Sequence, residues 1–181
     1  MTEPLSRRHV LGSAAAAGAA VLFTSGTATA AGRRPAALVA PLRPGIYALT
    51  RPHDQFLSLE GGREHVVLLP SVGLPGVQEW QVQARSDGTV TLKNVRHGTY
   101  IGYEDKPRAN QLIVAGDMPK AWALRPGAEP SAFHVVVPGG PVGGSELALD
   151  LSLLMLYPPR TALRPYRRTD QRQTWRFDFH G

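Results

Sequence analysis

The chain has 181 residues and a formal net charge of +6, from 20 lysines and arginines against 14 acidic residues. This length fits a single domain of ordinary size. The absence of cysteine excludes disulfides, thiol catalysis and cysteine-based zinc sites. Because the basic residues are scattered along the chain rather than clustered, the charge does not favour a nucleic-acid partner.

Residues 1–30 have the pattern of an export signal rather than of a folded segment. The pair Arg7–Arg8 precedes a mildly apolar, alanine-rich run over 12–23, and small residues at 28–30 fit the pocket of a signal peptidase. The run is shorter than the roughly 20 apolar residues that span a bilayer, so a membrane anchor is not expected. The sequence SRRHVL resembles a twin-arginine signal, which predicts a secreted bacterial protein, exported folded and cleaved before Ala31. The general export route remains an alternative.

The segment that follows the signal, residues 31–41, is rich in arginine, proline and alanine and shows no periodicity, which predicts a disordered linker. The rest of the chain, 42–181, is expected to form one domain built from an internal repeat. Its tryptophans, Trp80, Trp122 and Trp175, each stand two residues after a glutamine or a lysine. This recurrence indicates three copies of one unit.

Short segments of alternating apolar and polar residues, separated by turn residues, predict strands throughout 42–181. In chain order they are GIYALT, FLSLE, HVVLLP, WQVQAR, TVTLKN, TYIGYE, QLIVAG, WALRP, FHVVVP, ELALDLS, LLMLYP and QTWRFDF. Asp87–Gly88 is typical of a hairpin turn, and Gly102 inside a strand indicates a bulge or close packing. The apolar run Leu151–Tyr157 is expected to be a buried strand of the core rather than a membrane or partner surface.

About four strands in each of three copies predict an all-β fold, a β-trefoil with three four-stranded repeats preceded by a cleaved signal peptide. A β-propeller is the weaker alternative, because propellers usually have at least four blades.

Motifs for catalysis or cofactor binding are not found. The nearest approach to a nucleophile elbow, Gly143–Leu147, lacks the second glycine. The histidines do not have metal-binding spacings, and no glycine-rich phosphate loop joins a strand to a helix. We therefore expect no catalytic residue, no metal and no cofactor, and we do not expect an enzyme. Function is expected in loops that a rigid scaffold presents to a partner.

One candidate partner is a glycan. Glutamine two residues before tryptophan, as at Gln78–Trp80 and Gln173–Trp175, is a mark of ricin-type lectin trefoils. In such folds the tryptophan mainly fills the core and the glutamine satisfies buried backbone groups, so the motif indicates the fold more than a ligand. The best group for a sugar is Tyr103 with Asp105 and Asn110, although packing on or beside a strand is the favoured role of Tyr100 and Tyr103.

A second resemblance favours another partner. The segments DGTVTLKN, GTYIGY and VAGDMPKAWALRP resemble the cospin-like family of β-trefoil serine protease inhibitors, first known from mushrooms. The resemblance extends over about 42–179, and GDMPKAWALRP is its most specific part. It implies a monomeric inhibitor that presents an exposed, substrate-like loop to a serine protease.

The loop that best meets this implied role lies between FLSLE and HVVLLP and contains Gly61, Gly62, Arg63 and Glu64. Arg63 is suited to the acidic specificity pocket of a trypsin-like protease, through a bidentate guanidinium contact. Residues 106–108 and 164–172 are further candidate loops. The sequence thus favours a secreted inhibitor of a trypsin-like protease, with neither nucleic acid nor membrane as partner, and a carbohydrate-binding trefoil module is the alternative.

Overall fold

The structure is a computed structural model that describes residues 42–61 and 65–181. The expected signal peptide and linker lie outside the described residues. The described chain forms twelve strands and one 3₁₀ turn. The strands are β1 (Gly45–Arg51), β2 (Gln55–Ser58), β3 (Val67–Leu69), β4 (Glu79–Ala84), β5 (Val90–Asn94), β6 (Tyr100–Gly102), β7 (Val114–Gly116), β8 (Ala123–Pro126), β9 (Ala132–Val136), β10 (Leu147–Leu151), β11 (Thr161–Pro165) and β12 (Trp175–Phe179), with η1 (Gln171–Gln173) before the last.

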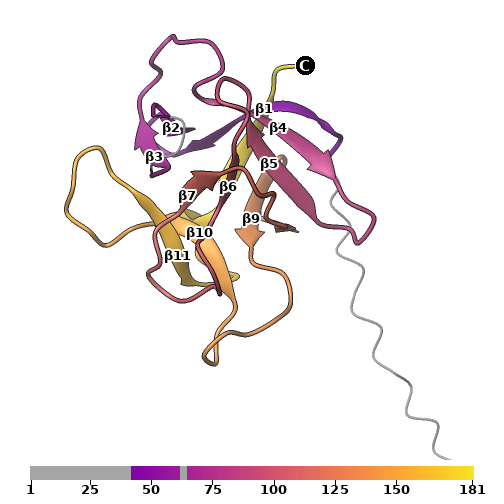
Figure 1. Cartoon of the computed structure of the whole chain (residues 1–181). Coiled ribbons are helices and arrows are strands. Elements are labelled where there is room, and N and C mark those ends of the chain that lie inside the picture. The colour runs from indigo at the N-terminus through magenta and orange to yellow at the C-terminus, as the bar shows by residue number, and fades with distance from the viewer. Residues whose placement is uncertain (1–41, 62–64) are drawn as a thin grey trace, which may run out of the picture. The chain divides into compact units, whose positions relative to one another are not determined.

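Six of these strands form an antiparallel ring, and Figure 1 labels four of them, β1, β4, β5 and β9. Neighbouring strands pair in the order β8, β9, β12, β1, β4 and β5. Between β5 and β8 the ring is closed by a bridge, in which Val90 and Trp122 exchange two backbone hydrogen bonds of 2.8 Å. This bridge closes the ring at one residue pair, and among the described strands β8 itself pairs only with β9.

The other six strands form three hairpins, β2–β3, β6–β7 and β10–β11. The first strand of each hairpin also pairs with a ring strand: β2 with β1, β6 with β5, and β10 with β9. The hairpins are joined to one another by the bridges His65↔Val114, Leu112↔Ala162 and Val67↔Arg160. Each third of the chain therefore contributes two ring strands and one hairpin.

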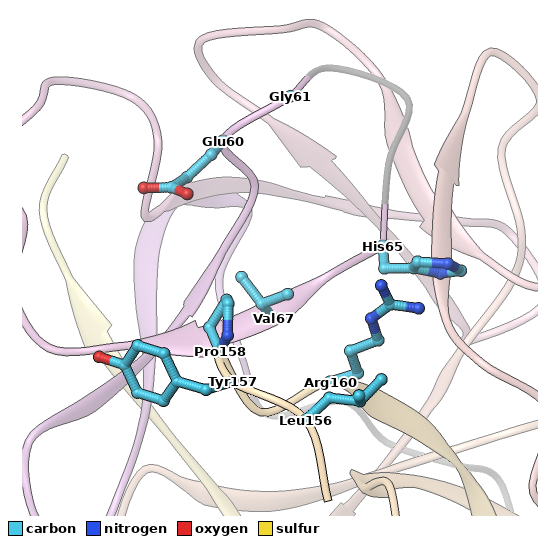
Figure 2. Close-up of a pocket in the computed structure, with 8 residues that line it drawn as sticks. All are labelled: Glu60, Gly61, His65, Val67, Leu156, Tyr157, Pro158 and Arg160. Carbon is cyan, nitrogen blue, oxygen red and sulfur yellow. The ribbon is translucent and has the colours of Figure 1, made fainter. Parts of the chain in front are cut away.

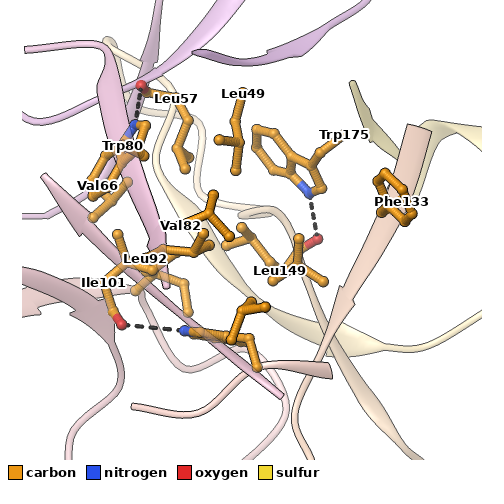
Figure 3. Packing of buried hydrophobic residues seen from close by; sticks show 14 of the residues in the cluster. Leu49, Leu57, Val66, Trp80, Val82, Leu92, Ile101, Phe133, Leu149 and Trp175 are labelled. Atoms are coloured by element: carbon orange, nitrogen blue, oxygen red, sulfur yellow. Dashed lines mark hydrogen bonds between the residues drawn. The ribbon is translucent and has the colours of Figure 1, made fainter. Parts of the chain in front are cut away.

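The three tryptophans occupy equivalent places in the core, and Figure 3 labels two of them, Trp80 and Trp175. All three are fully buried, and each indole nitrogen donates to a backbone carbonyl of the hairpin in its own copy. Trp80 donates to Leu57 at 2.9 Å, Trp122 to Ile101 at 3.3 Å and Trp175 to Leu149 at 3.0 Å. A buried tryptophan removes a large apolar area from water but needs a partner for its N–H, and these carbonyls supply it.

The glutamine before the first tryptophan satisfies backbone groups, as the sequence predicted. The Gln78 amide donates to the carbonyl of Pro70 at 2.8 Å and to the Ser58 hydroxyl at 2.9 Å. Its own carbonyl accepts from the backbone N–H of Val72 at 3.1 Å. The glutamine therefore ties the β2–β3 hairpin and the chain after it to the segment that leads into β4 of the same copy.

Gln173 makes the same contacts in the third copy. Its amide donates to the carbonyl of Pro165 at 2.9 Å and to the Asp150 carboxylate at 3.0 Å, and it accepts from Arg167 N–H at 2.8 Å. Ser58 and Asp150 thus stand at equivalent positions. In the middle copy Lys120 takes the place of the glutamine.

One predicted strand is wrong. The run Leu151–Tyr157 was expected to be a buried core strand, but β10 ends at Leu151 and Leu153–Tyr157 are exposed. The partner of β10 is instead β11, in a stretch for which the sequence predicted no strand, and Leu149 pairs with Leu163. Two prolines, at 158 and 159, follow the apolar run and lack the N–H that a ladder needs, whereas Thr161–Leu163 are buried against the core.

Helical structure in the described residues is confined to the 3₁₀ turn. Within residues 42–61 and 65–181, no helix has the length and apolar character required to cross a bilayer.

Candidate functional site

The hairpin of the middle copy borders a surface hollow of about 270 Å³ that combines aromatic rings with charged groups. We call it the Tyr100 hollow. It is lined by Tyr100, Gly102, Tyr103, Glu104, Val114, Ala115, Gly116, Asp117, Met118 and Lys120.

The strand pairing of β6 with β7 places these residues. Side chains alternate along a strand, and the middle residue Ile101 is fully buried in the core, so its neighbours Tyr100 and Gly102 face the other side. The ladder pairs Tyr100 with Gly116 and Gly102 with Val114. Since Gly116 has no side chain, the tyrosine ring is not covered from the β7 side. On the β5 side its cross-strand neighbour is Lys93, whose ammonium lies 5.6 Å from the ring centroid.

Tyr103 connects the hollow to the core. Its ring meets the buried Trp122 edge-on, with centroids 5.7 Å apart and planes at 88°. Burial raises the pKa of the Tyr103 hydroxyl, so the group remains a neutral hydrogen-bond donor and acceptor across the physiological range. The Lys120 ammonium lies 5.2 Å from the centroid of the same ring, a cation–π contact.

The position of Lys120 depends on Gly102. A β-carbon at residue 102 would stand 2.6 Å from Cγ of Lys120, closer than real side-chain atoms approach. The close packing predicted for Gly102 is therefore confirmed, and the neighbour is the lysine stem. The glycine lets the lysine lie flat on the strand and place its charge over Tyr103.

The Tyr100 hollow is suited to binding a small polar ligand. Tyrosine rings offer flat apolar faces, the carboxylates of Glu104 and Asp117 accept hydrogen bonds, and the Lys120 ammonium donates them. Its volume is slightly below the roughly 300–1,000 Å³ of sites for drug-sized ligands. Among the described residues, no group of three or more histidine, cysteine, aspartate or glutamate side chains could hold a metal ion.

The structure brings only one of the predicted sugar-binding residues to this hollow. Tyr103 lines it, whereas Asp105 and Asn110 lie exposed in the β6–β7 loop with left-handed φ of 47° and 65°. The Asn110 side chain accepts a hydrogen bond from Arg164, and its N–H donates to the Leu163 carbonyl at 2.7 Å. Asn110 therefore joins two hairpins.

The sequence analysis missed Tyr100, Glu104, Asp117 and Lys120 as lining residues. One signal could have indicated them. Lys120 stands where the other two copies have glutamine, which marks the middle copy as different at the position that closes its hairpin.

The predicted protease-binding loop is described only at its start. Gly61 is exposed, while Gly62, Arg63 and Glu64 lie outside the described residues. Glu60 and Gly61 border a second hollow, of about 240 Å³, whose other lining residues include Val67, Tyr157 and Arg160 (Figure 2).

No protein-family model matches the chain. No curated protein matches it either. Solved structures do match. A ricin B-like lectin of Macrolepiota procera, in complex with lactose, has a TM-score of 0.64 at 23% identity, over 77% of this chain and 99% of that one. The Rhizoctonia solani agglutinin has a TM-score of 0.63 at 20% identity, over 77% of this chain and 97% of the agglutinin.

A designed three-fold symmetric protein, ThreeFoil, matches at a TM-score of 0.63 and 18% identity, over 75% of this chain and 99% of that one. These structures share the architecture rather than the sequence. The resemblance to cospin-like inhibitors is supported at the level of the fold, and none of the structures named here is described as a protease inhibitor. The ring, the three hairpins and these matches together establish that the described chain is a β-trefoil.

Proposed function

We propose that the chain is a carbohydrate-binding module and that the Tyr100 hollow receives one sugar ring. The observation that carries the proposal is the lining of this hollow, where two tyrosines stand beside two carboxylates and one ammonium. The proposal reverses the order of the two functions favoured by the sequence, because the structures similar to this chain include lectins and none of those named here is described as a protease inhibitor.

The chemistry of a sugar fits this set of side chains. One face of a hexose carries C–H groups that pack on an aromatic ring, and its hydroxyls both donate and accept hydrogen bonds. Tyr100 would offer the ring, Glu104 would accept from hydroxyls, and Lys120 would donate to a ring or hydroxyl oxygen. With Asp117 as a second acceptor, three polar groups around one apolar face would fix the orientation of the ligand.

The structural matches support the choice of ligand class. The Macrolepiota procera lectin is described in complex with lactose, and a Polyporus squamosus lectin with a TM-score of 0.58 is described with a sialylated Galβ1-4GlcNAc epitope. Both ligands contain galactose, so lactose is the first probe and a glycan array is the second.

The test is calorimetric titration of the chain with lactose, together with a glycan array. Tyr100→Ala and Glu104→Gln should each weaken binding about tenfold or more, the loss expected for one stacking or charged contact. The matched control is Tyr157→Ala, an exposed tyrosine outside the hollow. If no glycan on the array binds, or if Tyr100→Ala binds as well as the parent chain, the proposal fails.

Protease inhibition is the second candidate, favoured by the anchoring of the loop ends. The β2–β3 ladder pairs Ser58 with Val67, so paired strands hold both sides of the segment that contains Arg63. Anchored ends would limit the conformational entropy lost when a protease binds the loop. The chain should then inhibit trypsin, and Arg63→Ala should abolish that inhibition. Equal inhibition by Arg63→Ala would exclude this loop as the reactive one.

We further propose that the chain works outside a bacterial cell after export by the twin-arginine route. The support is the sequence of residues 1–30. N-terminal sequencing of the protein recovered from culture medium should begin at Ala31, and replacing both Arg7 and Arg8 by lysine should retain it inside the cell.

A further inference from the structure

The loop between β10 and β11 exposes five consecutive large apolar side chains. The exposed fractions are 71% for Leu153, 50% for Leu154, 100% for Met155, 48% for Leu156 and 87% for Tyr157. We call this segment the Leu153–Tyr157 loop. It lies away from the ring strands in Figure 1. Folded soluble domains rarely present so many adjacent apolar side chains unless something covers them in use.

Hydrogen bonds hold the loop in this exposed arrangement. At its base, Ser152 N–H donates to the Arg160 carbonyl at 2.8 Å. Further along, Leu154 N–H donates to the Ser152 hydroxyl at 3.2 Å, and Leu156 N–H donates to the Leu154 carbonyl at 2.9 Å. These bonds satisfy backbone groups inside the loop and hold its shape, while the apolar side chains point outward.

Arginines lie on both sides of the loop. On one side, Arg160 shares a hollow with Leu156 and Tyr157, and Figure 2 shows its side chain directed away from the tyrosine ring. On the other side, a hollow of about 250 Å³ contains Leu151 and Leu153 together with four arginines. These arginines are Arg51, Arg164, Arg167 and Arg172.

The positive charge on these two sides is only partly neutralised. Arg51 pairs with Asp150 at 2.9 Å and Arg172 with Asp170 at 3.0 Å. Arg164 binds the neutral side chain of Asn110. Within the described part of the chain, the side chains of Arg160 and Arg167 have neither a hydrogen bond nor an ion pair. The Arg167 guanidinium acts on the Asp170 carboxylate only through its charge, without direct contact. An anionic partner would therefore find guanidinium groups with free hydrogen-bond donors on either side of an apolar tip.

We propose that the Leu153–Tyr157 loop inserts into the surface of an anionic lipid bilayer. Leucine and methionine side chains would enter the acyl region, Tyr157 would lie at headgroup level, and the flanking arginines would bind lipid phosphates. This interpretation replaces the expectation of no membrane partner, which depended on the run being buried.

The composition of the loop favours lipid over a protein partner. Binding hot spots between proteins are enriched in tryptophan, tyrosine and arginine, and leucine is under-represented. Here three of the five exposed side chains are leucine and one is methionine. The tip is also convex, since Met155 is fully exposed, and a fluid bilayer can accept a convex apolar tip without a preformed groove.

The first test uses the absence of cysteine in the chain. Met155→Cys in the full chain is labelled with an environment-sensitive fluorophore and mixed with vesicles of equimolar phosphatidylglycerol and phosphatidylcholine. We expect a blue shift and a rise in intensity. The same label at Val95→Cys, an exposed apolar position on the β5–β6 turn, should not respond. Because the label reports its own surroundings, binding by residues 1–41 would not imitate this result.

The second test measures partition by vesicle sedimentation. Each of Leu153→Ser, Leu154→Ser and Met155→Ser should weaken partition about tenfold, since each removes two or more methylene equivalents from the membrane. Val95→Ser is the matched control and should partition like the parent chain. Arg160→Ala and Arg167→Ala should also weaken partition, and added salt should do the same.

Three results would overturn the proposal. One is an unchanged Met155 probe on anionic vesicles. Another is an equal response on pure phosphatidylcholine, because the arginines would then have no role. The third is a dimer in solution that Met155→Ser dissociates, which would assign the loop to self-association. The vesicles carry no sugar, so failure here leaves the carbohydrate proposal untouched, and failure on the glycan array leaves this one untouched.

Discussion

The aliphatic stem of Lys120 lies on the backbone of Gly102, at a distance that leaves no room for a β-carbon. The equivalent pair in the first copy is Gln78 with Ser58, joined by a hydrogen bond of 2.9 Å. The middle copy therefore replaces a polar side-chain pair by packing of a lysine stem on a glycine. This replacement places an ammonium group in the Tyr100 hollow, where the first copy has a neutral amide.

Gly102→Ala should destabilise the fold by about 1–3 kcal/mol, because the new methyl group forces the Lys120 stem off the strand. Chemical denaturation measures the loss. Lys120→Ala in the same chain should recover most of it, since the clash disappears with the stem. A loss that is equal with and without Lys120 would show that backbone strain at residue 102, rather than the lysine, is responsible.

The Asp150 carboxylate accepts hydrogen bonds from three groups, so its removal should lower the stability of the fold. The carboxylate accepts from Arg51 at 2.9 Å, from the Gln173 amide at 3.0 Å and from the Leu151 N–H at 2.6 Å. Asp150→Ala should lower the free energy of unfolding by about 3 kcal/mol, because it leaves a mostly buried arginine unpaired.

Asp150→Ser is the matched control, since serine is the natural residue at the equivalent position 58. It should cost less than alanine because Gln173 keeps a partner. Thermal and denaturant unfolding compare the two variants. Equal losses would show that the Gln173 contact adds nothing to stability.

His134 should make the fold less stable as the pH falls below neutrality. The ring is fully buried and meets Tyr166 edge-on at 5.1 Å. Neither ring nitrogen has a hydrogen-bond partner of standard geometry in the described chain, although the backbone of Gln173 and Arg168 lies near enough to favour protonation slightly. Burial outweighs this and lowers the pKa of His134 below its ordinary 6.5.

The unfolded chain therefore binds a proton at a pH where the folded chain does not. The stability due to neutral His134 is complete above pH 6.5 and decreases as the pH falls below it, by at most about 1.4 kcal/mol per pH unit. Denaturation between about pH 5 and pH 8 measures the slope, and His134→Phe should remove it. The hydrogen bond with Arg125 lowers the pKa of the Glu146 carboxyl, so this group affects the stability of the fold only at lower pH. An unchanged slope in His134→Phe would contradict this assignment.

The Asp87–Gly88 turn between β4 and β5 should tolerate few substitutions at its glycine. Gly88 has φ of 80°, where a side chain costs roughly 1–2 kcal/mol. Gly88→Ala should show that loss in denaturant unfolding, and Gly88→Asn a smaller one, because asparagine adopts left-handed conformations more readily. Equal losses would indicate a steric rather than a conformational cause.

The sequence predicted the trefoil because its signals are local and repeated. Alternation, turn residues and the three tryptophans lie within short windows, and the structure places Trp80, Trp122 and Trp175 at equivalent positions. It failed at β11, where only Ala162 and Leu163 are apolar between Thr161 and Arg164. Nearby, LLMLYP has the apolar character of a core strand but is followed by two prolines.

The Tyr100 hollow was harder to predict because strand pairing, rather than a regular spacing in the sequence, brings its lining residues together. Tyr100 and Lys120 are twenty positions apart in sequence, and the β6–β7 ladder brings them to one surface. Asp105 and Asn110 are nearer to Tyr103 in sequence, yet their loop turns away through two left-handed residues. Proximity in sequence therefore pointed to the wrong neighbours of Tyr103 within the hollow.

The two ends of the described domain are hydrogen-bonded to each other. Ile46 N–H donates to the Gly181 carbonyl at 2.6 Å, and His180 N–H donates to the Ile46 carbonyl at 2.8 Å. A short linker could therefore join residue 181 to residue 42, and new termini could be opened at the Asp87–Gly88 turn with every strand pair retained. Because its two ends lie side by side, the domain could also be inserted into a surface loop of another protein without forcing the ends of that loop apart.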